Sequence, residues 1–386
     1  MARLGDICTF QSGGTPSKTV PAYYQGNIPW ITTVSLTGGR ISNEDAIEYI
    51  TDQAIRESAA KIVPQNSIMV GTRVGVGKVA INTVPMSTSQ DIISLLNIDE
   101  STWNKDFLCK FIAAKSAYLN SQARGATIKG IKIETLASLD LPEITLEEQK
   151  HISRVIDEVL QLVKYRKDQL NELDQLVKSR FIELFGMPGT DVNGWGLTPL
   201  GNTCQINPKK GQDSRLTSGL TVSFVPMPAV SENGNIDPSD TREYDAVKTG
   251  FTYFAEKDVL FAKITPCMEN GKGAVARGLH NGIGFGSTEF HVLRPLPNIS
   301  NPYWIYTLTA FPEFRSDAAN NMTGSAGQRR VPSSFLEQYR VSLPPIELQN
   351  EFAAFVEHTD KLKLAVTEAL AELETLKKSL MQQYFG

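Results

Sequence analysis

Two glycine-rich basic segments contain the residues best suited to contact a ligand. The first runs from Arg124 to Lys132 and the second from Asn320 to Arg330, and both combine Lys or Arg with Gly and with hydroxyl or amide side chains. Lys and Arg can pair with phosphates or with the edge of guanine, Asn and Gln with adenine, and Gly lets a backbone approach a duplex closely. This composition favours contact with DNA, although solvated turns often share it.

The candidate DNA contacts in the two segments are Arg124, Thr127, Lys129, Lys132, Asn321, Gln328, Arg329 and Arg330. Lesser candidates elsewhere in the chain are Arg73, Lys78, Ser89, Gln90, Lys209, Lys210, Lys263 and Lys272. The formal net charge of the 386-residue chain is −4, so affinity for nucleic acid has to come from such local patches.

Motifs of nucleotide-using enzymes are incomplete in this sequence. The segment Gly75–Ala80 fits a GxGxxA pattern, but the β-branched residues that follow, up to Pro85, leave no helix N-terminus to hold a phosphate. A P-loop also fails, because Lys78 is followed by Val79 instead of Ser or Thr. The run Asn301-Pro302-Tyr303-Trp304 is interpreted as a turn that opens a helix. No catalytic residue is predicted.

Histidines and cysteines are scattered along the chain. The four His and four Cys residues show no CxxC pair and no spacing typical of a nucleophile or a metal site. We therefore expect reduced thiols and no metal.

The chain is a duplication. Residues 170–186 align without gaps to residues 370–386. The same offset pairs Gln149 with Gln349, and Leu4-Gly5-Asp6 matches Leu200-Gly201-Asn202. Upstream of the two glutamines, Leu141-Pro142 echoes Leu343-Pro344, which implies two extra residues in the first copy. Between these ends the halves diverge, so the ends indicate shared architecture and each middle indicates its own contacts.

Two long helices close the two halves. Residues from about Leu146 to Phe185 contain no Pro or Gly, and apolar residues recur there at gaps of three and four. The Gly186-Met187-Pro188-Gly189 run ends the first helix, and the second copy repeats the pattern. About 36 residues at roughly 1.5 Å each give about 54 Å, so each helix needs a partner. We expect an antiparallel coiled coil of the two copies; the alternative is that each helix packs on its own domain.

The divergent middles are predicted to be sheet-rich. Short apolar runs at 67–70, 78–81, 91–95, 258–262 and 289–293 indicate strands, and helices are expected at 106–121 and 303–319. The fold class is therefore α+β: two pseudo-repeated mixed α/β domains joined by two long helices. The expected boundaries are 1–146, 147–186, 187–346 and 347–386.

The start of the sequence has no apolar signal core, and no stretch approaches the roughly 20 apolar residues of a membrane span. We expect a cytoplasmic protein.

Taken together, the duplicated order of these motifs resembles the specificity subunit of type I restriction-modification enzymes. The resemblance rests on the two Leu-Gly openings, the Leu-Pro boxes before Gln149 and Gln349, and the two Phe-Gly helix ends at 185–186 and 385–386. It covers the full chain and implies that each middle is a target-recognition domain for one half of a bipartite DNA site.

The resemblance also implies the partners. The helices would act as a spacer and bind two DNA adenine methyltransferase subunits, and restriction subunits with ATP-driven translocation would join them. S-adenosylmethionine, ATP and magnesium would belong to those subunits, so no cofactor is expected in this chain. The helix residues expected to bind partners are Ile152, Val159, Leu173, Phe181, Phe352, Leu362, Leu373 and Leu380.

Two other functions fit the same sequence. One is the specificity subunit of a related system in which methyltransferase and nuclease are fused in one partner. The other is a coiled-coil scaffold without a role at DNA.

Overall fold

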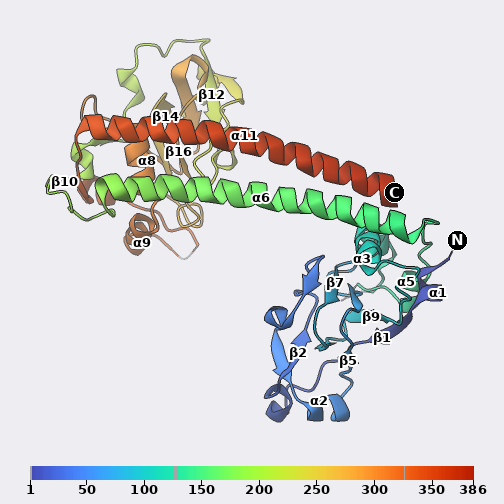
Figure 1. Ribbon diagram of the computed structural model, residues 1–386. Coiled ribbons are helices and arrows are strands. Elements are labelled where there is room, and N and C mark those ends of the chain that lie inside the picture. Colours follow the sequence, from blue (N-terminus) through green and yellow to red (C-terminus); the bar gives the residue numbers. More distant parts are fainter. Residues whose placement is uncertain (1, 126–128, 326) are drawn as a thin grey trace. The chain divides into compact units, whose positions relative to one another are not determined.

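The computed structural model describes residues 2–125, 129–325 and 327–386, and the chain divides into two compact units. The first unit comprises residues 1–166 and 369–386, and the second comprises residues 167–368. The long helices α6 (Leu146–Phe185) and α11 (Ile346–Phe385) each contribute a segment to both units. Each unit therefore combines a globular part with two helical segments (Figure 1).

The globular part of the first unit contains two sheets, with strand orders β1-β9-β6-β7-β3 and β4-β2-β8-β5. Its strands are β1 (Thr9–Ser12), β2 (Ile28–Ile31), β3 (Arg40–Ile41), β4 (Glu48–Ile50), β5 (Ile62–Val63), β6 (Ile68–Gly71), β7 (Val79–Asn82), β8 (Met86–Thr88) and β9 (Ile92–Leu96). Its helices are α1 (Leu4–Ile7), η1 (Pro21–Tyr24), η2 (Asn43–Asp45), α2 (Asp52–Glu57), α3 (Lys105–Ala114), α4 (Ser116–Gln122) and α5 (Ile133–Ala137).

The second unit contains sheets of order β11-β18-β15-β16 and β13-β12-β17-β14 and the pair β10-β19. Its strands are β10 (Leu197–Pro199), β11 (Cys204–Ile206), β12 (Thr221–Val225), β13 (Thr241–Glu243), β14 (Thr252–Ala255), β15 (Val259–Ala262), β16 (Gly273–Val275), β17 (Ile283–Gly286), β18 (Phe290–Pro295) and β19 (Arg340–Ser342). Its helices are η3 (Leu200–Asn202), η4 (Lys210–Gln212), η5 (Met227–Ala229), α7 (Tyr244–Val247), η6 (His280–Gly282), α8 (Pro302–Ala310), α9 (Pro312–Asn320) and α10 (Ser333–Gln338).

The strands predicted from apolar runs are confirmed to within a residue or two as β6, β7, β9, β15 and β18. They form equivalent antiparallel pairs in the two units. Val70 of β6 lies opposite Ile93 of β9, and Phe261 of β15 lies opposite His291 of β18. The α+β fold class is confirmed in both units.

Each helix expected after the last central strand is broken in two. The second unit has its break at Phe311, which adopts φ −64° and ψ 141° because Pro312 follows and disfavours the helical region for the residue before it. In the first unit the break falls at Lys115, where ψ is 5° and the ammonium donates to the carbonyl of Phe385.

The two long helices pack antiparallel within each unit. In the second unit Phe181 of α6 meets Phe352 of α11 with ring centroids 5.5 Å apart, and Asp174 pairs with Lys363 at 2.6 Å. In the first unit Ile152 near the start of α6 shares a core with Phe385 at the end of α11. Both cores also include residues of the globular part, so each helical pair packs on its domain as well as on itself.

The two Phe-Gly ends have the same structural role. Phe385 packs on Phe107 and Phe111 of α3 with centroids 5.4 and 6.1 Å away, and Phe185 packs on Phe352 and Trp195 at 5.5 and 6.5 Å. Each terminal ring of a long helix is therefore buried in a domain core, which explains why the sequence repeats it.

The start of each long helix is fixed by a buried glutamine. Gln149 donates to the carbonyls of Thr102 and Ile144, at 3.1 and 3.3 Å. Gln349 donates to the carbonyls of Ile299 and Pro344, at 3.1 and 2.8 Å. Ile144 and Pro344 are thus equivalent at an offset of 200. The prediction of two extra residues in the first copy is therefore wrong. It came from aligning Leu141-Pro142 with Leu343-Pro344, whereas the hydrogen bonds show no insertion.

Candidate nucleic-acid interface

Described residues at the ends of the two basic glycine-rich segments pair at equivalent places through backbone hydrogen bonds, and each such pairing is called a hairpin. In the first unit Arg124 and Gly130 exchange both backbone hydrogen bonds, at 2.9 and 3.0 Å; in the second, Thr323 and Arg330 do the same at 2.9 and 2.8 Å. The residue after each hairpin donates to the residue that follows the central strand: Ile131 to Thr72 and Val331 to Lys263. In each domain, therefore, a basic hairpin lies at the end of the equivalent central strand, β6 or β15.

An acidic residue lies beneath each hairpin. The amide of Thr72 donates to the carbonyl of Asp91 and that of Lys263 to the carbonyl of Glu289, so the two acids are equivalent. Glu289 binds the Arg330 guanidinium through both carboxylate oxygens, at 2.9 and 2.8 Å. This contact with Arg330 lowers the pKa of Glu289. The hairpin of the second unit is thereby tied to the sheet through a side chain.

In the first unit the arginine near the equivalent acid comes from the segment after β6 and not from the hairpin. Arg73 approaches Asp91 at 3.9 Å, and its side chain lies against Gly130. A Cβ at Gly130 would lie 2.9 Å from the Arg73 Cγ, so the glycine leaves room for that side chain. Gly130 is the counterpart of Arg330. Each domain thus has a guanidinium near the equivalent acid, supplied by a different segment.

The remaining hairpin candidates differ in availability. Arg124, Lys129, Lys132, Gln328 and Arg329 are exposed, with Arg329 lying 3.7 Å from Glu269. Asn321 is exposed, and its amide donates to the carbonyl of Asp317. Thr127 lies outside the described residues. Arg330 is committed to Glu289, so its charge supports the hairpin in this structure.

Of the lesser candidates in the first unit, Arg73, Lys78 and Gln90 are exposed and Ser89 is buried. Lys78 is exposed beside Gly75, and Gln90 is exposed, but Ser89 is only 4% exposed. The expected DNA contact by Ser89 is therefore not available in this conformation, because its side chain lies inside the domain.

The lysine candidates of the second unit converge only in part. Lys210 and Lys263 line a hollow of about 370 Å³ together with Lys248, which the sequence did not single out. Lys209 is exposed next to Lys210, whereas the ammonium of Lys272 donates to the carbonyl of Met227 at 3.4 Å. The hollow brings together lysines with no common sequence spacing.

A buried histidine joins this hollow to the hairpin. His291 is 6% exposed, and its Nε2 donates to the carbonyl of Val331 at 2.8 Å. Its Nδ1 then accepts from the Asn207 amide nitrogen at 3.0 Å. Desolvation by burial lowers the pKa of His291, so the ring is neutral and acts as a structural link.

The helix residues expected to bind partners are mostly buried inside the chain. Phe352, Phe181, Ile152 and Val159 are 0, 1, 7 and 7% exposed, and Leu173, Leu373 and Leu380 are half-buried. Phe352, Phe181 and Ile152 belong to the hydrophobic cores of the units and Val159 is also buried, so these four side chains are not exposed to a partner in this structure. Leu362 is 45% exposed and retains that possibility.

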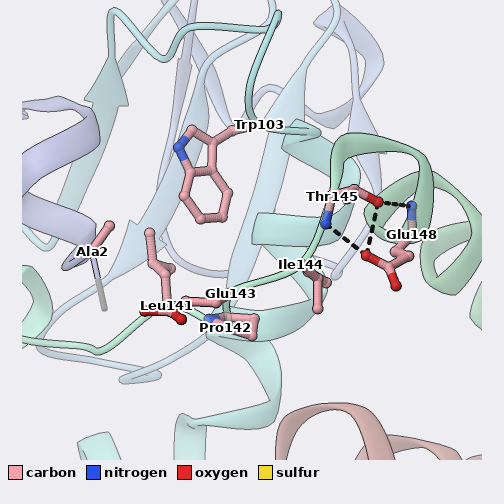
Figure 2. Close-up of a pocket in the computed structure, with 8 residues that line it drawn as sticks. All are labelled: Ala2, Trp103, Leu141, Pro142, Glu143, Ile144, Thr145 and Glu148. Carbon is pink, nitrogen blue, oxygen red and sulfur yellow. Dashed lines mark hydrogen bonds between the residues drawn. The ribbon is translucent and has the colours of Figure 1, made fainter.

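A shallow groove of about 320 Å³ lies at the start of α6 in the first unit (Figure 2). Trp103, Leu141, Pro142 and Ile144 give it an apolar lining. The helix begins with a capping box, in which the Glu148 amide donates to Thr145 Oγ1 at 3.2 Å and the Thr145 amide to the Glu148 carboxylate at 2.7 Å.

Burial raises the pKa of Cys8, Cys109 and Cys204 to about 12. In the described part of the chain, no three His, Cys, Asp or Glu side chains gather as metal ligands would. Nor does any helix in the described ranges combine the length and hydropathy required to cross a membrane.

The comparison with protein families settles which family this architecture represents. The model described as "Type I restriction modification DNA specificity domain" matches residues 1–175 and, a second time, residues 194–375. The chain belongs to this family. The two matches fall on the two halves of the duplication, so the resemblance inferred from the repeated ends is confirmed.

Curated relatives in this family match different shares of the chain. The type I restriction enzyme EcoAI specificity subunit of Escherichia coli is 36% identical over 49% of this chain and 32% of its own length. The EcoEI subunit, also from Escherichia coli, is 40% identical over 39% of this chain and 25% of its own length. The chain thus spans a third or less of these two relatives. The EcoKI subunit of Escherichia coli strain K12 aligns with 100% of the chain and 88% of its own length, at 23% identity.

Two solved structures share the fold of this family member. The type I restriction-modification S subunit from M. genitalium has a TM-score of 0.55 at 14% identity, covering 100% of this chain and 95% of that one. A chain from a study of complex assembly in the type I R-M system has a TM-score of 0.59 at 16% identity, covering 100% and 96%. At these identities the likeness concerns the fold alone.

Proposed function

We propose that the chain is the DNA-reading subunit of a type I restriction-modification enzyme and that each unit reads one half of a bipartite site. The observation that carries the proposal is the equivalent placement of the two basic hairpins, Arg124–Gly130 and Thr323–Arg330, on the same edge of duplicated domains. A shared scaffold with divergent exposed side chains suits two readers that contact different bases.

Phosphate contacts and base contacts would divide between the hairpin residues. The exposed Arg329 is suited to the guanine edge or to a phosphate, and the exposed Gln328 beside it is suited to adenine. Arg330 would act through the hairpin, because Glu289 already holds its guanidinium. In the first unit Arg124 and Lys129 are the exposed cations of the hairpin, and Arg73 would have the supporting role.

The long helices would act as spacer and as platform for partners. Forty helical residues span about 60 Å at roughly 1.5 Å per residue, which is longer than one turn of duplex DNA. Leu160, Leu162 and Leu176 of α6 are 37 to 48% exposed, and Leu362, Leu364 and Leu376 of α11 are 45 to 61% exposed. These leucines, rather than the buried ones, are the proposed contacts for two modification subunits. Restriction subunits would join that complex.

Methyl transfer and cleavage would take place in those partners, which would also hold S-adenosylmethionine, ATP and magnesium. A reader that grips the duplex while another subunit extrudes the target adenine separates recognition from chemistry.

The test is a genome-wide map of methylated adenine in a host that expresses the chain with its neighbouring methyltransferase, and in a host that lacks only the chain. A bipartite motif with a fixed gap should appear only when the chain is present. Identical maps in the two hosts would refute a role in guiding methylation and would favour a scaffold without a role at DNA.

A further inference from the structure

The hollow beside the second hairpin is lined by cationic and hydroxyl-bearing residues. Its volume is about 370 Å³, and the residues that matter here are Asn207, Lys210, Lys248, Thr249, Tyr253 and Lys263. They come from the segment after β11, from the loop before β14, from Tyr253 within β14 and from the residue after β15. Among the described lining residues none is acidic.

Acidic side chains near the hollow already have partners. Asp213 accepts a hydrogen bond from Tyr253 at 2.7 Å and pairs with Arg215 at 2.6 Å. Glu289, whose pKa is lowered mainly by Arg330 and also by Lys263, is held by the Arg330 guanidinium. The field inside the hollow is therefore set by the lysines.

The lysines are held in place to different degrees. The ammonium of Lys210 donates to the backbone carbonyl of Lys248, and the ammonium of Lys248 pairs with Asp245 at 3.0 Å. Lys263 is half-buried beside His291, which is neutral and adds no competing charge. An anion that enters would meet Lys263 and Lys210 with one further donor, the Thr249 hydroxyl, since the Asn207 amide nitrogen already donates to His291 Nδ1.

We propose that this hollow is a phosphate site that binds one phosphodiester of the DNA backbone next to the half-site read by the second domain. The inference rests on the proposed function and adds to it a sequence-independent contact. Lysine ammonium groups act as point charges toward phosphate and release counterions when they bind it.

The site belongs to one half of the duplication. The amide of Ile131 donates to the carbonyl of Thr72, and the amide of Val331 donates to the carbonyl of Lys263. Thr72 is therefore the counterpart of Lys263. Phe10 pairs with Leu95 as Ile206 pairs with Leu293, which makes Gly14 the counterpart of Lys210. The first unit has no lysine at either place, so the two domains grip the backbone unequally.

The experiment measures binding of the full chain, with its methyltransferase partner, to duplexes that carry the methylated motif. One set of duplexes replaces single phosphates by neutral methylphosphonates across both half-sites. The variants are Lys263→Gln and Lys210→Gln, and the matched control is Lys257→Gln. Lys257 lies in the turn between the end of β14 and the start of β15. The hollow is lined by the other ends of these two strands.

For each lysine variant the negative slope of log K against log salt should become shallower by about 0.9, the value of one phosphate contact. The wild type should lose affinity at one or two methylphosphonate positions of the second half-site, and Lys263→Gln should no longer respond there. Lys257→Gln should behave as the wild type. If Lys263→Gln lowers the melting temperature, the exposed Lys210→Gln decides the matter.

Unchanged slopes and an unchanged methylphosphonate profile in both variants would overturn the phosphate site while leaving sequence-specific binding by the wild type intact. Absence of sequence-specific binding by the wild type would instead overturn the proposed function, and the phosphate site with it.

Discussion

The side-chain oxygen of Gln349 accepts a hydrogen bond from the backbone amide of Asn301 at 2.8 Å, which fixes the start of α11 to the N-terminus of α8. Gln149 makes the same bond to Asn104 at 2.9 Å, at the N-terminus of α3. Both glutamines are almost fully buried, with 1% exposure for Gln149 and 0% for Gln349. One junction is therefore used twice, and it orients each domain on its helical pair.

Replacing Gln349 by Ala should destabilise the second unit. The carbonyls of Ile299 and Pro344 and the amide of Asn301 would lose their partner, and a buried polar group without one costs about 1–3 kcal/mol. Chemical denaturation followed by circular dichroism measures the loss. Gln175→Ala, at an exposed position of α6, should stay within about 0.5 kcal/mol of the wild type. Equal effects of the two variants would contradict a special role for the junction.

Replacing Glu289 by Gln should loosen the second hairpin without unfolding the domain. Loss of a charge-assisted pair weighs about 1.5–3 kcal/mol, so the amides of Thr323 and Arg330 should exchange at least about tenfold faster. Hydrogen exchange resolved by mass spectrometry measures this. Asp91→Asn, at the equivalent place in the first unit, should leave that hairpin unchanged.

The Glu289–Arg330 pair also predicts a pH dependence. The pKa of Glu289 is below its ordinary value of 4.5 in the folded chain, so the stabilisation is present above that value and is lost as pH falls through the lowered pKa. Protection of the Thr323 amide, corrected for intrinsic exchange, should therefore fall on acidification below about pH 4.5 in the wild type and stay flat in Glu289→Gln. A parallel fall in both proteins would assign the effect to another group.

Replacing Gly130 by Ala should disturb the first hairpin. The new Cβ would lie 2.9 Å from Arg73 Cγ and 3.0 Å from the Thr72 carbonyl, and overpacking of this kind costs about 1–3 kcal/mol. Faster exchange at Arg124 is the expected readout. Gly39→Ala, where nothing lies within 4 Å of the new Cβ, is the matched control. Normal protection of the hairpin in Gly130→Ala would show that Arg73 moves aside freely.

Replacing Phe385 by Ala should destabilise the first unit, although the residue lies at the far end of the sequence. Its ring packs on Phe107 and Phe111, and loss of a buried Phe costs about 3–5 kcal/mol. Exchange should rise in α3 and remain unchanged in α8. Ser379→Ala, at an exposed position of the same helix, should have no such effect. Uniform loss of protection in both domains would contradict a core confined to the first unit.

The sequence was most informative where local physics decides the structure. The bounds of α6 and α11 follow from apolar residues at helical spacing and from the glycine and proline that end the first copy. The central strands follow from short apolar runs. The break at Phe311 was also readable, because Pro312 acts on the residue before it, but the apolar pattern through Tyr303–Ala319 masked it.

The parts that escaped prediction depend on contacts between distant segments. Lys210, Lys248 and Lys263 line one hollow because β11 and β15 both pair with β18 in one sheet, while β14, in the other sheet, is joined to β15 by a short turn. Burial of Ser89 and the engagement of Arg330 by Glu289 also depend on distant segments, so residue type alone could show neither. The equivalence of Asp91 and Glu289 could be read from the sequence, since each is the acidic first residue of a predicted strand.

The measurement that tests the central claim most directly is the assignment of half-sites. Arg124→Ala with Lys129→Ala, and separately Arg329→Ala, should each be introduced into the host used for adenine mapping, with the exposed Arg56→Ala as control. We predict that the first pair relaxes or abolishes recognition of one half of the motif and Arg329→Ala of the other, since a lost guanine contact costs about 1–3 kcal/mol of discrimination. The gap between the halves should stay fixed. Relaxation of the same half by both changes, or an unchanged motif in both, would contradict the assignment of one reader to each unit.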